Sequence, residues 1–183
     1  NNIQDSGSEM KKFIRYHWLS KYSFETEKKL YNTIKASVNN YEKFLDELVT
    51  SSEVYKNILT GISSNFSDLI VNGKDISSKI HNIVFSSMNM SITQDTVFYL
   101  SLIRNIEAGK LLVKPDNFLI KLENFLFKYF AVSSLPANKV ERLFSKYATQ
   151  LEEVCNENIP INQIKQNTTR VYNNFKDDLN DLL

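Results

Sequence analysis

Glycine and proline are scarce in this chain, whose 183 residues include four glycines and three prolines. A protein built from strands needs both residues often, because they supply the backbone angles of tight turns. The scarcity therefore argues against an all-β architecture. The chain is 42% hydrophobic, which is enough apolar material for one core, and its length suits one domain.

Cysteine is also scarce, and long hydrophobic runs are absent from the sequence. Cys155 is the single cysteine, so no disulfide can form within the chain. This favours a reducing compartment, and we expect a cytoplasmic protein, while a cell-surface or secreted location stays open. No apolar run in the sequence approaches the roughly 18 residues that a membrane span requires.

Few residues suggest catalysis, metal binding or cofactor binding. His17 and His81 lie far apart in the sequence, and neither has a second histidine or a cysteine at the spacing of zinc ligands. The four glycines do not form a phosphate-binding loop. Glu152 and Glu153 are neighbours, and on a helix they point in different directions. We therefore expect no enzyme, no cofactor and no metal site.

The net charge is small, since 22 lysines and arginines oppose 21 acidic residues to give +1. Domains that bind nucleic acid are usually much more basic, with a pI above about 9, so a nucleic-acid partner is disfavoured. Charge is nevertheless uneven. Residues 9–35 carry a balance of +4 and residues 151–183 a balance of −3. The basic end suits an anionic partner, with ordinary solvated surface as the alternative.

A heptad pattern dominates the first half of the chain. Between residues 24 and 69, twelve of fourteen a and d positions are apolar or aromatic, and Glu27 and Ser52 are the exceptions. This pattern predicts one long helix over about residues 24–70, or a helical hairpin broken near Ser51 and Ser52.

The remaining sequence also has helical periodicity. Residues 1–8 are polar and predict a disordered leader, and residues 9–183 predict a single helical-bundle domain. Asn72 and Gly73 predict a turn. Residues 117–132 are apolar around most of a helix, so we expect them to lie centrally. The predicted fold is all-α, an elongated bundle of five to seven helices.

The N-terminal segment, residues 10–24, interleaves cations with aromatic residues. Such a mixture suits an anionic membrane surface or RNA, and it also suits aromatic residues packed in a core with lysines reaching outward. The candidate partner or membrane surface comprises Lys11, Lys12, Arg15, Trp18, Lys21, Lys28 and Lys29.

The long heptad run, a break and further helices behind a basic N-terminal segment resemble BAR-type membrane-curvature modules. Rods of vesicle-tethering complexes and helical surface lipoproteins have a similar spacing of apolar residues, and no residue role is transferred from any of them. We expect a scaffold or adaptor that binds a protein partner through a helical face, with Tyr31, Tyr41 and Tyr55 as interface anchors. The alternative is a peripheral membrane module that forms a homodimer.

Overall fold

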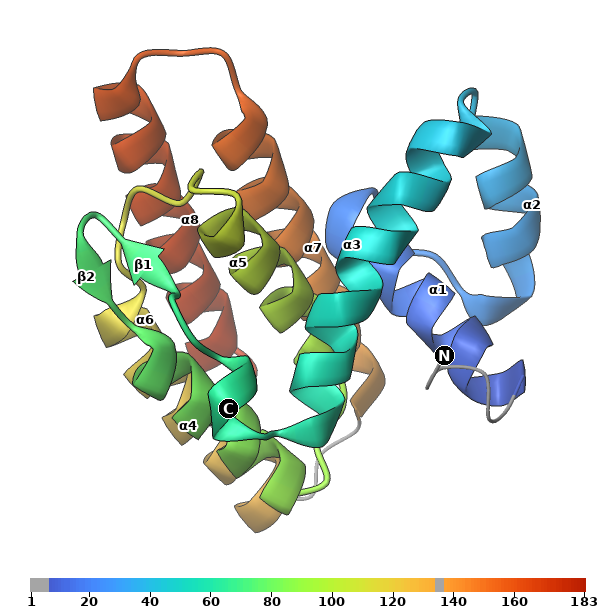
Figure 1. The fold of residues 1–183 in the computed structure, drawn as a ribbon. Helices are drawn as coiled ribbons and strands as arrows, with labels where there is room; N and C mark the ends of the chain where they lie inside the picture. The colour runs from blue at the N-terminus through green and yellow to red at the C-terminus, as the bar shows by residue number, and fades with distance from the viewer. Residues whose placement is uncertain (1–6, 134–136) are drawn as a thin grey trace.

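The computed structural model describes residues 7–133 and 137–183, and within them the chain forms eight α-helices (Figure 1). The helices are α1 (Gly7–Lys21), α2 (Glu27–Ser37), α3 (Tyr41–Thr60), α4 (Ser77–Asn89), α5 (Thr96–Glu107), α6 (Asp116–Leu126), α7 (Ala137–Asn156) and α8 (Ile161–Asn180). The shorter elements are a 3₁₀ turn η1 (Ser63–Asn65), a π-helical segment η2 (Phe127–Val132) and strands β1 (Ile70–Val71) and β2 (Lys74–Asp75). The predicted all-helical class is confirmed, and there are more helices than the five to seven expected. Residues 1–6 of the predicted leader lie outside the described residues, and α1 begins at Gly7.

Helix α5 is the centre of the fold. Every residue from Thr96 to Ile106 is buried, and α5 packs against α1, α3 and α7. The prediction that residues 117–132 lie centrally is wrong, because Ile120 and Phe127 are more than half exposed. An aromatic contact joins α7 to α8, where the ring of Phe175 stacks on that of Tyr147 at a centroid distance of 4.3 Å.

The heptad region folds back as two helices. A continuous helix over residues 24–70 is wrong, and so is a break near Ser51 and Ser52, because the chain breaks at residues 38–40 between α2 and α3. Asn40 caps α3, and its side-chain oxygen accepts a hydrogen bond from the Lys43 backbone N–H at 2.9 Å. Figure 1 shows α2 rising to this turn and α3 returning from it, with α2 at the edge of the molecule.

The Asn72–Gly73 turn is confirmed. Both residues have positive φ, +51° at Asn72 and +72° at Gly73, and they connect β1 to β2 as an antiparallel hairpin. Asn and Gly are the residues that adopt this left-handed conformation most readily. The hairpin leads directly into α4, which packs against α6.

Gly61 ends α3 in the left-handed conformation, with φ at +58°, and a Cβ atom there would lie 2.5 Å from Met88 Sδ. We expect Gly61→Ala to lower the free energy of unfolding by about 1–3 kcal/mol, because alanine is strained at this φ and Met88 must move. Gly73→Ala is the matched control, since φ is also positive and no atom lies within 4 Å of its Cβ position. Urea unfolding of both variants measures the difference. If both variants lost the same free energy of unfolding, the contact with Met88 would not contribute to the destabilisation by Gly61→Ala.

Candidate functional site

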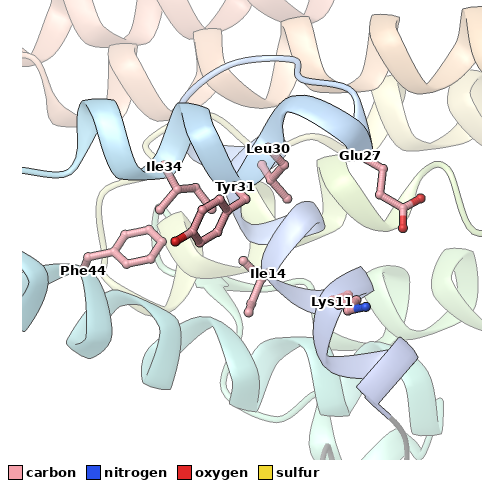
Figure 2. A pocket seen from close by; sticks show the side chains of 7 residues that line it. All are labelled: Lys11, Ile14, Glu27, Leu30, Tyr31, Ile34 and Phe44. Carbon is pink, nitrogen blue, oxygen red and sulfur yellow. The ribbon is translucent and has the colours of Figure 1, made fainter.

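A groove of about 470 Å³ lies between α1, α2 and the first turn of α3. Its lining residues are mostly apolar or aromatic, and they are Lys11, Ile14, Glu27, Leu30, Tyr31, Ile34 and Phe44. Figure 2 shows Leu30, Tyr31 and Ile34 projecting from α2 toward the side of the groove that Ile14 and Phe44 form. Lys11 lies at one end of this apolar surface.

Helix α2 creates the groove because its apolar face is only partly covered. Its apolar and aromatic residues recur at 3–4 spacing, but Leu30 is the one buried residue on the helix. Tyr31 is 73% exposed although it lines the groove. Such an apolar helix face, left open beside other helices, is typical of a surface that packs against another molecule.

One lysine lies on the edge of this groove, and two more lie on α2, outside the lining. The lysine on the edge is Lys11, and Lys28 and Lys29 are exposed on the first turn of α2. Glu27 is the acidic residue in the lining. Lys11 and Glu27 are the charged residues of the lining, and Lys28 and Lys29 add positive charge to α2 outside it.

Two of the aromatic residues in the predicted surfaces are core residues, and their assignment needs correction. Trp18 is 2% exposed and stacks on Tyr22, with ring centroids 4.5 Å apart. Tyr55 is fully buried against α1, where its ring lies 5.3 Å from that of Phe13. Both occupy the inward face of an amphipathic helix, so neither is available to a membrane or a partner. Tyr41 is exposed at the start of α3 but does not line the groove.

Arg15 is bound within the fold rather than presented to solvent. Its Nη1 and Nη2 donate to the two carboxylate oxygens of Glu141 at 2.5 and 2.7 Å. The hydrogen bond with Glu141 raises the pKa of Arg15 against the opposing effect of burial. This bidentate pair joins α1 to α7, so it has a structural role that its sequence position did not indicate.

Lys21 and Lys12 also have contacts inside the protein. Lys21 Nζ lies 3.2 Å from Glu47 Oε1, and Lys12 Nζ lies 5.6 Å from the ring centroid of Tyr16. The candidate surface is therefore reduced to the exposed cations Lys11, Lys28 and Lys29, together with Tyr31. Lys11 and Tyr31 line the groove, and Lys28 and Lys29 follow directly on Glu27, which also lines it.

A buried polar network, centred on Arg104 of α5, lies away from the groove. Arg104 Nη1 donates to Ser20 Oγ at 3.0 Å and to Ser51 Oγ at 3.2 Å. Its Nη2 donates to Glu152 Oε2 at 3.1 Å, and Asn105 donates to the same oxygen at 2.9 Å. The network therefore connects α1, α3, α5 and α7 through hydrogen bonds.

His17 belongs to this network and is not poised for acid–base chemistry. Its Nδ1 lies 2.8 Å from Ser51 Oγ. Burial, with the nearby charges of Arg104 and Lys21, lowers the pKa of His17 to about 3. The ring is neutral at physiological pH, whereas an acid–base catalyst needs a pKa near the pH at which it works.

Cys155 is buried in the fold and is not activated as a nucleophile. Burial raises the pKa of Cys155 to about 12, so its thiol stays protonated and is a poor nucleophile. In the described residues, no three His, Cys, Asp or Glu side chains are grouped so that they could hold a metal ion. Within residues 7–133 and 137–183, none of the helices combines the length and hydrophobicity needed to cross a bilayer.

Comparison of the chain with family models, curated proteins and solved structures finds no match. The geometry of the chain itself is therefore the basis for inferring its function. The groove between α1, α2 and α3 brings together an open apolar helix face, an exposed tyrosine and exposed lysines.

Proposed function

We propose that this protein is a non-catalytic helical scaffold or adaptor, which binds a helix of a partner protein in the groove between α1, α2 and α3. The observation that supports this most directly is the open face of α2, where Tyr31 is 73% exposed beside Leu30 and Ile34. Amphipathic helices bind in grooves of this kind by placing apolar residues at 3–4 spacing against the apolar lining. Tyrosine is among the residues that contribute most to such interfaces.

The charge of the surface defines the partner further. A helix in the groove would lie beside Lys11, and Lys28 and Lys29 add positive charge to α2, so acidic residues flanking its apolar face would be attracted and basic ones repelled. These lysines are exposed, and the attraction is therefore expected to weaken with added salt. The partner is an amphipathic helix with acidic flanks.

The alternative is a dimeric peripheral membrane module that uses the basic aromatic N-terminal segment. Two observations favour the groove over this alternative. Trp18, the strongest interfacial aromatic in the segment, is buried, and Arg15 is held by Glu141. An anionic bilayer would meet exposed lysines without the Trp18 side chain that would otherwise insert beside them.

A synthetic helix tests the proposal. The probe is a fluorescently labelled peptide with leucines at 3–4 spacing and glutamates on both flanks, and its binding is followed by fluorescence anisotropy. We expect Ile34→Glu to weaken binding at least ten-fold, because it places a carboxylate in the apolar lining. Ile120→Glu is the matched control, since Ile120 is an exposed isoleucine on α6, away from the groove. It should bind as the unmodified protein does.

Equal binding of the peptide by the Ile34→Glu variant and the unmodified protein would contradict the proposal. The proposal would also be contradicted if the protein did not bind the peptide but sedimented with anionic vesicles, and if Lys28→Glu and Lys29→Glu abolished that sedimentation. That result would establish the membrane alternative. If light scattering shows a dimer of the unmodified protein that Ile34→Glu dissociates, a second copy of the chain occupies the groove, which would contradict a heterologous partner.

A further inference from the structure

A second cavity, of about 200 Å³, lies at the other end of α3. Residues from three helices and from the connection between α4 and α5 line it, and they are Ile58, Leu59, Val84, Ser87, Met88, Ser91, Ile92, Thr93, Asp95, Thr96 and Tyr99. Ile58 and Phe44, which lines the groove, are fourteen residues apart on α3, so the two sites are separated by about 21 Å along the helix. The second cavity is therefore distinct from the groove.

Asp95 distinguishes this cavity from an ordinary packing defect. The residue is 1% exposed, and among the described residues its Oδ2 has no hydrogen-bond partner. Buried carboxylates in proteins are normally paired with a cation or fully hydrogen-bonded, because an uncompensated charge is costly to remove from water. Burial raises the pKa of Asp95 to about 6, although hydrogen bonds from Ser87 and Tyr99 to the carboxylate act in the opposite direction. A cation in the cavity would supply the missing compensation.

We propose that this cavity binds a small organic ammonium ion, with the Asp95 carboxylate as its counter-ion. A metal cation such as Ca²⁺ is usually held by several carboxylates, whereas Asp95 is the one carboxylate in this lining, and most of the cavity surface is apolar. The lining suits a ligand with an apolar body and one charged end. A cavity of about 150 Å³ accommodates benzene, so this larger one has the size for benzylammonium. The inference does not depend on the function proposed for the groove.

Hydroxyl groups next to the carboxylate can accept the remaining ammonium hydrogens. Ser87 Oγ and Tyr99 OH lie 3.2 Å apart and both residues line the cavity. An ammonium group donates three hydrogen bonds, and a carboxylate with two hydroxyl oxygens provides that number of acceptors. The carboxylate thus supplies the charge that attracts the ammonium group, and the two hydroxyl groups orient it.

The other titratable groups around Asp95 do not supply a positive charge. Tyr99 on α5 and Tyr16 on α1 both have pKa values raised mainly by burial, so both are neutral through the physiological range. Glu123 on α6 lies near Tyr99 and accepts a hydrogen bond from Ser86 Oγ at 2.7 Å. The lining residues from α3 and α4 carry no charge. An incoming ammonium ion therefore meets no competing cation.

Benzylamine, titrated into isotopically labelled protein and followed by NMR, tests the site. We expect the methyl resonances of Met88 and Ile92 to shift, with affinity for benzylamine at least ten-fold above that for benzyl alcohol, its neutral counterpart of equal size. Ten-fold selectivity is the minimum for one desolvated charge pair. Affinity should fall as the pH decreases through about 6, because Asp95 takes up a proton there.

Two variants assign the effect to the carboxylate. Asp95→Asn keeps the shape and removes the charge, so it should lose at least ten-fold in affinity for benzylamine and keep that for benzyl alcohol. Asp68→Asn is the control, since Asp68 is exposed with φ at +59°, a conformation that asparagine tolerates. Unchanged benzylamine binding by the Asp95→Asn variant, or equal affinity of the unmodified protein for the two ligands, would overturn the proposal. If potassium chloride displaced benzylamine more strongly than choline chloride did at the same concentration, the site would be assigned to a metal cation instead.

Discussion

Replacing Arg104 with methionine is expected to lower the free energy of unfolding by about 3–5 kcal/mol, the largest effect of any single substitution considered for this protein. Methionine fills much of the arginine volume, so the loss comes from the polar partners left behind. Glu152, whose side chain is 12% exposed, would lose the guanidinium that lies 3.1 Å away and keep the more distant Lys21 at 3.9 Å, and Ser20 and Ser51 would each lose a donor. Urea unfolding followed by circular dichroism measures the change.

Two further variants separate the ion pair from the general effect of changing an arginine. Arg170→Met alters an exposed arginine on α8 and should cost less than about 0.5 kcal/mol. Adding Glu152→Leu to Arg104→Met removes the remaining carboxylate and should recover about 2 kcal/mol, because a buried ion pair replaced as a whole costs less than one broken in half. If Arg104→Met were no more destabilising than Arg170→Met, the network would have no structural role.

Asp95→Asn should increase stability, and the gain should depend on pH. The pKa of Asp95 is raised from 3.8 to about 6 in the folded protein, so the native state binds the proton more tightly than the unfolded state. The stabilisation from this protonation is complete below about pH 4 and is lost as the pH rises through about 6. At about pH 8 the carboxylate is charged, and asparagine avoids that cost, which corresponds to up to about 3 kcal/mol.

Thermal and urea unfolding of both proteins at about pH 4 and pH 8 check this prediction. The other shifted acids, such as Glu107 and Asp178, are common to both proteins, so the difference isolates Asp95. Asp68→Asn again serves as the exposed control and should show no pH-dependent gain. A variant that gained equally at both pH values would show that the Asp95 charge does not limit stability. A residue retained at such a cost is typical of a binding site rather than of a core.

The helical class could be predicted because it depends on local features, namely few glycines and prolines and apolar residues at helical spacing. The turn at Asn72 and Gly73 was predictable for the same reason, since its geometry is determined by those two residues. The break at residues 38–40 was not, because Val38 and Tyr41 continue the heptad pattern across it. Asn40 was the available signal, as an asparagine at a helix start accepts a backbone hydrogen bond.

The candidate site was predictable in part. Exposed lysines and Tyr31 were recognisable from an amphipathic helix, but their grouping around a groove depends on how α2 sits beside α1. Arg15 and Trp18 were assigned wrongly because Arg15 pairs with Glu141 and Trp18 packs against Phe44, and both are tertiary contacts. Arg104 was overlooked, although a single arginine within the apolar sequence of α5 indicates a buried partner. The cavity beside Asp95 forms from three helices, and no sequence pattern describes it.

The pairing of Arg15 with Glu141 has a consequence for the order of events during synthesis. The two residues are separated by 126 positions in the chain. At about 5–20 residues per second, a ribosome needs about 6–25 s to extend the chain from one to the other. Through that interval α1 has no α7 to pack against, so the hydrogen bonds that Arg15 and the Leu19 carbonyl make with α7 are missing. Of the described helices, α1 is synthesised first and completes its packing only after α7 emerges, so substitutions in α7 should lower the yield of folded protein.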